Sequence, residues 1–426
     1  MARWKKRLKK WRFSLRKRIF KLVPDVMHIG RRAFVRGILL SGQPGLEKHF
    51  SMNAEGKLCF ERELLAQELF GDRPWLVPVV KRGVRTVAMC RYKQEQRLDH
   101  AVQGMDEETR LEVARQALRI AWEIFNKGYA HRDFHSRNLF WVKDRLMATD
   151  FETLEPYPAD QIPAFPESYD VSGGGLPSPY STANMSYVRD RSDGLQQVLG
   201  VPLNEAMKGV HESLEEWLRE ESLSFQTGKD RHLTKAERIY GSFELPHFSV
   251  KADKVQRNSS RRMERFGVKP SMIEGKRVLD LGCHCGAMLL EAQRFRPASS
   301  LGIEFDAAKV DVAQAVARFN GLRSVEFRPG DVDTLEPDSL GQKYDVVFCL
   351  AINGHVKKPD RLYDLLGRVT GDRLLFEGNL GTDVEAVTSK LREAGFASVT
   401  HVGMSDDDCV PKNNNRPMIV AQRHPA

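Results

Sequence analysis

A loop with the composition needed for phosphoryl transfer occupies residues 131–138, where the sequence is His-Arg-Asp-Phe-His-Ser-Arg-Asn. Asp133 in this loop is expected to orient and deprotonate an attacking hydroxyl group. Asn138 and Asp150, which begins the triplet Asp-Phe-Glu, are expected to bind Mg²⁺ against the phosphates of ATP. Carboxylates suit this task because the metal site must offset the charge on the transferred group.

The spacing of His131, Arg132, Asp133 and Asn138 resembles the protein-kinase signature, and this resemblance implies that a lysine anchoring the phosphates lies upstream, on a strand followed by a helix that carries its glutamate partner. Lys48 is the candidate with Glu63 as its partner, and Lys57 with Glu61 is the alternative pair. A solvated surface charge is the other interpretation of either lysine. No Gly-x-Gly-x-x-Gly loop precedes them, and Gly37 and Gly42 offer only a loose equivalent of the usual phosphate loop.

The elements that must position these residues follow from the hydrophobic pattern. Residues 107–127 have helical periodicity, and Gly128 is placed to end that helix. An apolar strand at 139–142 follows the loop, and the strand at 87–92 is expected to contact adenine. This order and the motif spacing resemble protein kinases, except that Glu152 replaces the usual glycine. The resemblance implies an α+β protein-kinase-like domain.

A second loop, at 280–286, has the sequence Asp-Leu-Gly-Cys-His-Cys-Gly and lies between an apolar strand and a helical segment. Small residues there let the backbone approach a nucleotide-like ligand. Glu304, at the end of the next strand, is placed to accept hydrogen bonds from two ribose hydroxyls, and Asp331 with Val332 to bind adenine. Because the dehydrogenase pattern Gly-x-Gly-x-x-Gly is absent, S-adenosylmethionine is favoured over NAD. The expected contacts within the loop are Asp280, which would face the methionine amine, Gly282, Cys283 and Gly286.

Apolar strands alternate with helical patterns through the C-terminal half. The strands are predicted at 277–281, 301–304, 325–328, 344–350, 373–377, 399–403 and 417–421, with helices between the first six. This alternation predicts an α/β Rossmann-like sheet whose last two strands are joined only by a loop. The layout resembles class I S-adenosylmethionine-dependent methyltransferases. His355, after the fourth strand, is either a general base or a structural histidine.

The net charge of +9 is concentrated at the N-terminus, where residues 1–21 contain eleven Lys or Arg and no Asp or Glu. Apolar residues recur in this segment at helical spacing, at Trp4, Leu8, Trp11, Leu15, Ile19 and Leu22. This pattern predicts a basic amphipathic helix over residues 1–24, whose residues 1–22 bind an anionic membrane surface. A helix that packs on protein, and a segment that contacts RNA phosphates, are the alternatives. Nucleic acid is not expected as a partner of the rest of the chain, which is close to neutral.

Cysteine usage and hydropathy bear on the compartment. Six scattered cysteines do not form a disulfide framework and fit a reducing environment. The Cys-His-Cys stretch at 283–285 is not expected to bind a metal, since no second ligand pair lies at zinc spacing. With no apolar run long enough to span a membrane and no signal peptide, the sequence predicts a cytoplasmic protein on the inner face of the cell membrane.

The expected organisation is the basic helix at 1–24, the protein-kinase-like domain at 25–240 and the methyltransferase domain at 241–426. The two motif sets together resemble the bacterial enzymes that terminate O-polysaccharide chains (the WbdD-like family), although that family carries its methyltransferase first. Those enzymes phosphorylate the terminal sugar of a lipid-linked glycan and then methylate the phosphate. The resemblance implies a bifunctional enzyme that uses ATP, Mg²⁺ and S-adenosylmethionine on a glycan or other small-molecule acceptor, beside the glycosyltransferases of a cell-surface polysaccharide pathway.

Three other functions are compatible with the same motifs. A kinase and a methyltransferase with unrelated substrates could be fused in one chain. A membrane-associated scaffold could bind nucleotides without turnover. An RNA or small-molecule methyltransferase could carry a regulatory kinase-like domain.

Overall fold

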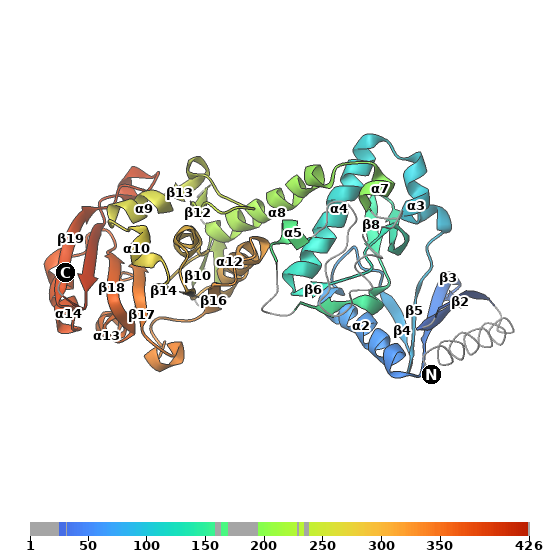
Figure 1. Cartoon of the computed structure of the whole chain (residues 1–426), viewed down its shortest axis with the longest axis horizontal. Coiled ribbons are helices and arrows are strands. Elements are labelled where there is room, and N and C mark those ends of the chain that lie inside the picture. The colour runs from blue at the N-terminus through green and yellow to red at the C-terminus, as the bar shows by residue number, and fades with distance from the viewer. Residues whose placement is uncertain are drawn as a thin grey trace, which may run out of the picture. The chain divides into compact units, whose positions relative to one another are not determined.

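The chain forms two compact units in the computed structural model, which describes residues 25–30, 32–157, 163–168, 195–227, 230–233 and 238–424 (Figure 1). Unit 1 comprises residues 1–161 and 166–210, and unit 2 comprises residues 162–165 and 211–426. The expected boundary lay between residues 240 and 241. The division into units falls earlier in the chain, because residues 211–240 belong to unit 2. The basic helix predicted for residues 1–24 lies outside the described residues.

Unit 1 begins with a five-stranded antiparallel sheet in the order β1-β2-β3-β5-β4. Helix α2 (Ala54–Phe70) follows the third strand and begins at Asn53, whose side chain accepts a hydrogen bond from the Gly56 N–H. The strands are β1 (Val26–Ile29), β2 (Ala33–Leu40), β3 (Gln43–Phe50), β4 (Val79–Arg82) and β5 (Thr86–Cys90). The helix and sheet share a buried cluster of Ala33, Phe50, Cys59, Phe60, Val77, Val87 and Met89.

The rest of unit 1 positions the loop at 131–138. Helix α4 (Glu107–Asn126) begins at Asp106, which accepts a hydrogen bond from the Thr109 N–H, and the chain turns away at Gly128, whose φ is 83°. This confirms the helix predicted over residues 107–127. The other elements that the structure describes before residue 200 are η1 (Gln94–Gln96), α3 (Leu98–Ala101), η2 (Val102–Gly104), β6 (Tyr129–Ala130), η3 (Ser136–Asn138), β7 (Leu139–Val142), β8 (Arg145–Ala148), η4 (Phe151–Thr153), β9 (Glu155–Pro156), α5 (Phe165–Ser168) and α7 (Leu195–Leu199).

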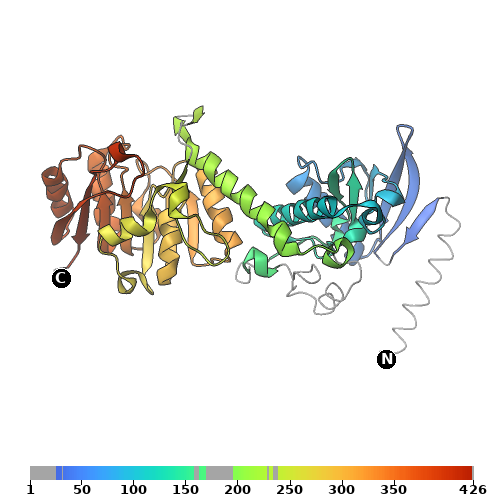
Figure 2. The same ribbon diagram turned by 90° about the horizontal axis from the view of Figure 1, so that it is seen from above.

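Helix α8 (Leu203–Leu223) contains the division between the two units, which falls after Val210. Figure 2 shows α8 as one continuous helix. Short elements follow it in unit 2: β10 (Ser224–Thr227), β11 (Asp230–Leu233), β12 (Ile239–Gly241), η6 (Ala252–Lys254), β13 (Val255–Arg257), α9 (Ser259–Arg265) and α10 (Pro270–Ile273). Strands β12 and β13 pair in parallel.

Unit 2 is built on a seven-stranded sheet in the order β16-β15-β14-β17-β18-β20-β19 (Figure 1). Its strands are β14 (Arg277–Leu281), β15 (Ser299–Glu304), β16 (Val325–Pro329), β17 (Tyr344–Leu350), β18 (Thr370–Glu377), β19 (Ser398–Met404) and β20 (Pro417–Gln422). Strand β20 runs antiparallel to both of its neighbours, whereas the first five strands are mutually parallel. The predicted Rossmann-like sheet of seven strands is therefore confirmed.

Helices connect most of these strands: α11 (Ala287–Ala292) with η7 (Gln293–Phe295), α12 (Ala307–Phe319), α13 (Pro359–Val369) and α14 (Val384–Glu393). The last two strands are joined by a loop that contains only the short turn η9 (Pro411–Asn413). The prediction of a helix between the third and fourth strands is wrong, because that connection contains only the short turn η8 (Pro337–Leu340). Pro337 begins this turn and Gly341, with φ of 79°, ends it before a full α-helix can form.

The core of unit 2 explains why its strands could be recognised. Residues of the central strands such as Leu279, Val347 and Phe376 are fully buried, because helices cover both faces of a parallel sheet. The carboxyl ends of the parallel strands meet at one edge, where ligands bind in sheets of this kind. Among the described residues, no helix has the length and apolar character needed to cross a membrane.

Candidate active sites

A cavity of about 910 Å³ lies in unit 1 between the sheet and the loop at 131–138. Every residue predicted for the first site lines this cavity: Lys48, Glu63, Asp133, Asn138 and Asp150. Its size suits a ligand as large as a nucleotide. Arg132 and His135 of the loop also line it, together with residues outside any predicted motif such as His28, Gly30 and Arg32.

Lys48 is a buried cation held by three carboxylates. Its Nζ lies 3.3 Å from Glu63 Oε2 and 2.9 Å from Glu152 Oε2, and it also donates to Asp150 Oδ1. Burial alone lowers the pKa of Lys48, but Asp150, Glu63 and Glu152 together raise it well above its ordinary value. The lysine is therefore charged. The alternative pair, Lys57 and Glu61, lies on the exposed surface of α2, with Lys57 Nζ 3.6 Å from Glu61 Oε1.

Asp133 faces the same cavity with both carboxylate oxygens oriented by neighbours. His135 Nε2 lies 3.2 Å from Oδ1, and Asn138 Nδ2 donates to Oδ2 at 3.3 Å and to the Asp133 carbonyl at 2.9 Å. The Arg137 N–H donates to His135 Nδ1, so the neutral imidazole carries its proton on Nε2, toward Asp133. The loop thus presents one carboxylate in a fixed orientation.

Asp150 and the loop are joined by a buried histidine. The ring of His131 contacts Phe134 and Phe151, and its Nε2 lies 3.2 Å from the carbonyl oxygen of Thr149. Burial lowers the pKa of His131, so the ring is neutral and donates to that oxygen. Asp150 adopts a left-handed backbone conformation, with φ of 66°, which turns its side chain toward Lys48.

The turn between β1 and β2 belongs to this cavity although the sequence analysis did not include it. The Gly30 N–H donates to the Ala33 carbonyl at 2.8 Å, and a Cβ at Gly30 would lie 3.0 Å from that oxygen. Arg32 pairs with Glu55 at 3.0 Å and Glu152 at 3.5 Å. The sequence signal that could have indicated this turn is a glycine at position 30, followed by two arginines and an apolar strand.

The second predicted site lies at the carboxyl edge of the sheet in unit 2. Gly282 and Gly286 have φ of 74° and 77°, and a Cβ on either would lie 2.5 Å from Ile352 or Phe327, respectively. Only glycine fits both positions. Cys283 is buried between them, and its backbone N–H donates to the Ile303 carbonyl at 3.1 Å. The two glycines therefore let the loop pack closely against Ile352 and Phe327 next to the end of β14.

Glu304 and Asp331 lie at the ends of neighbouring strands. Glu304 accepts hydrogen bonds from the backbone N–H groups of His284, at 2.8 Å, and Asp306, at 3.1 Å. Burial raises its pKa, although these two hydrogen bonds oppose the shift. Asp331 Oδ1 accepts from the Asp333 N–H, and Val332 packs against the core. The structure therefore brings Glu304 beside the glycine loop and fixes the turn that carries Asp331.

Asp280 lines a small cavity together with two arginines, Arg257 and Arg262. It is 2% exposed, and burial raises its pKa from 3.8 to about 7, an effect that Arg262 reduces and Glu304 increases. An Asp with this pKa is available to become charged when a cation enters. The arginines were missed because they lie before the first strand of the sheet, in short elements without a clear periodicity.

The raised pKa predicts how Asp280 affects stability. Its folded-state pKa of about 7 lies above the ordinary 3.8, so the group favours folding below about pH 4 and loses this contribution as the pH rises through 7. The neutral variant Asp280→Asn should therefore match wild type at pH 4 and exceed its free energy of unfolding by on the order of 4 kcal/mol at pH 8. Urea unfolding at both pH values tests this, with the exposed Asp364→Asn as control. Equal stabilities of Asp280→Asn and wild type at pH 8 would contradict the expectation.

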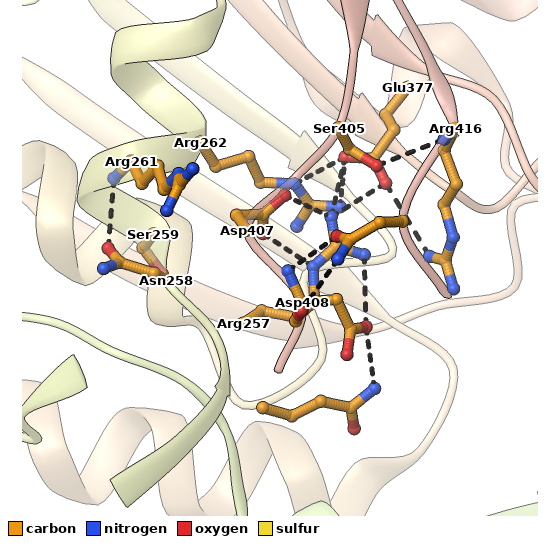
Figure 3. A network of polar contacts seen from close by, with 12 residues as sticks. Arg257, Asn258, Ser259, Arg261, Arg262, Glu377, Ser405, Asp407, Asp408 and Arg416 are labelled. Carbon is orange, nitrogen blue, oxygen red and sulfur yellow. Dashed lines mark hydrogen bonds and ion pairs between the residues drawn. The ribbon is translucent and has the colours of Figure 1, made fainter. Parts of the chain in front are cut away.

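A buried ion network closes this end of the site (Figure 3). Arg257 forms a bidentate contact with Asp407, at 2.6 and 2.8 Å, and also donates to Glu377. Glu377 in turn accepts from Arg262 at 2.6 Å. Asp408, whose side chain is fully buried, lies 3.8 Å from Arg257. The network fixes the segment before β14 against the end of β18 and the loop after β19.

Two other residues near the second site have contrasting surroundings. Tyr240 stacks on the half-buried His284 of the glycine loop with a ring distance of 4.2 Å, a contact that the sequence did not indicate. His355 is exposed, and its backbone N–H donates to the Ile352 carbonyl. No grouping of His, Cys, Asp and Glu suited to a metal occurs in the part of the chain that the structure describes.

Comparison with known proteins bears on the second site. Residues 273–380, which include the glycine loop, Glu304 and Asp331, match a methyltransferase domain family. Ubiquinone biosynthesis O-methyltransferase of Acinetobacter baylyi is 37% identical over 87 residues, which are 20% of this chain and 36% of that protein. Ribosomal protein L11 methyltransferase of Deinococcus radiodurans is 31% identical over 135 residues, 30% of this chain and 47% of that protein. The chain thus covers less than half the length of these relatives.

A search of solved structures matched the N-terminal domain of EvdMO1 in the presence of SAH and D-fucose, with 18% identity, a TM-score of 0.35, and coverage of 51% of this chain and 97% of that one. Magnesium protoporphyrin IX methyltransferase from Synechocystis PCC 6803 with bound SAM has 18% identity, a TM-score of 0.33, and coverage of 39% and 78%.

Proposed function

We propose that this chain, whose unit 2 contains a methyltransferase domain, transfers a methyl group from S-adenosylmethionine in unit 2 and a phosphoryl group from ATP in unit 1. The acceptor is a small molecule or the terminal sugar of a glycan. Methyl transfer is supported by the position of the glycine loop (residues 280–286), which carries Asp280 and lies beside Glu304 at the carboxyl edge of the sheet. The observation that carries the second half is the contact of Lys48 with Glu63 and Asp150 in a cavity shared with Asp133.

The residues of unit 2 fit S-adenosylmethionine, which supplies an electrophilic methyl group on a sulfonium. Glycine at positions 282 and 286 lets the loop turn tightly at the carboxyl ends of the strands, where ligands bind in sheets of this kind. Asp280 offers a carboxyl group that would ionise beside the methionine amine, and Arg262 lies on the same cavity for its carboxylate. Glu304 retains free lone pairs for ribose hydroxyls, and the turn at Asp331 offers its carboxylate to adenine.

The residues of unit 1 suit Mg²⁺–ATP, which supplies the phosphoryl group. Lys48 would contact the phosphates, and release of its carboxylate partner Asp150 would let that side chain and Asn138 hold the metal. Asp133, already oriented by His135, would accept the proton of the attacking hydroxyl. In this proposal unit 1 is protein-kinase-like, with Glu152 as an additional carboxylate beside Lys48.

We favour a small-molecule acceptor for methyl transfer and an order in which phosphorylation comes first. The relatives named for ubiquinone biosynthesis point to a small-molecule acceptor, and the relative named for ribosomal protein L11 makes a protein acceptor the second candidate. A phosphate monoester is anionic near neutral pH and can attack a methyl group without a strong base. Because the phosphate needs no strong base, the exposed His355 is not required as one. The main task of the protein in this reaction is to align the phosphate with the methyl group. Residues 1–22 would keep the protein on an anionic membrane that carries the glycan.

The proposal is tested by incubating the purified chain with Mg²⁺–ATP, S-adenosylmethionine and a mannose- or rhamnose-terminated oligosaccharide. Mass spectrometry should detect a phosphorylated sugar, and a methylated one only after ATP has been supplied. Methylation that does not require ATP would replace the coupled scheme with two unrelated activities. Calorimetric binding of Mg²⁺–ATP and S-adenosylmethionine without any turnover would favour the scaffold interpretation. Salt-dependent RNA binding together with RNA methylation would favour the RNA methyltransferase.

A further inference from the structure

One carboxylate outside the predicted motifs joins three elements of unit 1. Glu155, in the short strand β9, lies 2.6 Å from Arg62 on α2 through Oε1 and 2.6 Å from Arg132 in the loop at 131–138 through Oε2. The Arg132 side chain is 6% exposed, and those of Arg62 and Glu155 are 20% and 18% exposed. Each oxygen of the carboxylate therefore holds a different arginine in a largely buried contact.

The two arginines favour the charged form of the Glu155 carboxylate. Burial alone raises the pKa of Glu155, but the hydrogen bond and charge of Arg132, together with Arg62, lower it below its ordinary value. Charge-assisted contacts of this length are stronger than neutral hydrogen bonds. Because β9 also pairs with β6, at Ala130 opposite Glu155, the backbone fixes where this carboxylate lies.

The bridge couples two halves of the first site. Arg62 precedes Glu63, which contacts Lys48, and Arg132 precedes Asp133. Movement of α2 away from the loop would therefore separate the group that contacts the phosphates from the group that accepts the hydroxyl proton. In enzymes that are switched on by phosphorylation, a phosphate group attached to a loop binds arginines and thereby orders that loop.

We propose that Glu155 is a positioning residue that permanently supplies the anion holding α2 to the loop at 131–138, so that the phosphoryl-transfer site is assembled without prior phosphorylation. This inference rests on the proposed phosphoryl transfer. It assigns no contact with substrate to Glu155, and its effect acts through Arg62 and Arg132.

The test measures ADP release from Mg²⁺–ATP by the full-length chain, with Asp133→Asn as the blank. Glu155→Gln removes the charge and is expected to lower kcat about tenfold or more, with KM for Mg²⁺–ATP changed less than about threefold, because small misalignments of reacting groups affect turnover strongly. Glu155→Asp, which keeps the charge, should recover part of the loss. Arg62→Gln should lower kcat similarly, and the double variant should be little worse than either single variant.

Two controls separate positioning from folding. Glu61→Gln removes an exposed carboxylate from the same helix and should leave kcat unchanged. S-adenosylmethionine binding to unit 2, measured on the same Glu155→Gln sample, should equal that of wild type. Turnover of Glu155→Gln within twofold of wild type overturns the inference and leaves the proposed function in place. A wild-type chain that neither binds Mg²⁺–ATP nor releases ADP overturns the proposed function and this inference with it.

Discussion

Replacing Asp133 by asparagine is expected to lower phosphoryl transfer about a thousandfold, the range in which general bases contribute. The variant keeps the size of the side chain and can still contact His135 and Asn138, so the loop should retain its conformation. It cannot accept the hydroxyl proton. Steady-state ADP release with the oligosaccharide acceptor measures the effect.

Asp144→Asn is a matched control for this substitution. Asp144 is exposed in the turn between β7 and β8, with φ of 59°, a conformation that asparagine tolerates. Its activity should equal that of wild type. Wild-type turnover by Asp133→Asn would remove the loop at 131–138 from the catalytic mechanism and with it the assignment of unit 1 as a phosphotransferase.

Replacing Glu304 by glutamine is expected to weaken S-adenosylmethionine binding about a hundredfold, since charge-assisted hydrogen bonds to two ribose hydroxyls would be weakened or lost. The substitution also replaces one carboxylate oxygen, so either the His284 or the Asp306 N–H would lose its acceptor. Isothermal titration calorimetry at pH 8 measures the dissociation constant.

The control for Glu304 is Glu326→Gln on the adjacent strand β16, because the Glu326 side chain is 55% exposed and pairs with Arg328 at the surface. Its affinity should match wild type. If Glu304→Gln binds S-adenosylmethionine within threefold of wild type, the ligand does not lie over the end of β15, and the proposed arrangement of the second site fails.

The sheet of unit 2 was predictable because burial on both faces leaves a direct record in the sequence. Each parallel strand is a short apolar run, as in the segment that ends at Leu281, and each run is followed by turn residues. The connection containing η8 was predicted wrongly as a helix because the alternation suggested one, whereas Pro337 and Gly341 restrict it to a single turn.

The candidate sites were predictable where one motif supplies several groups at fixed spacing. Asp133 and Asn138 lie on one loop, so their spacing alone indicates that they share a cavity. Arg262 and Glu155 have no such signal. Their partners, Glu377 and Arg62, lie 115 and 93 positions away in the sequence, and pairing over such distances depends on the packing of the whole unit.

The ion network around Arg257 has a consequence for excising the methyl-transfer unit from this chain. The residues that match a methyltransferase domain, 273–380, include Glu377 but exclude the arginines that surround it. A fragment cut at those limits would leave a carboxylate in an apolar interior without a counter-ion, which is among the most destabilising changes a protein can undergo. The smallest autonomous fragment must therefore begin before β13 and continue through Arg416, which lies 3.7 Å from Glu377.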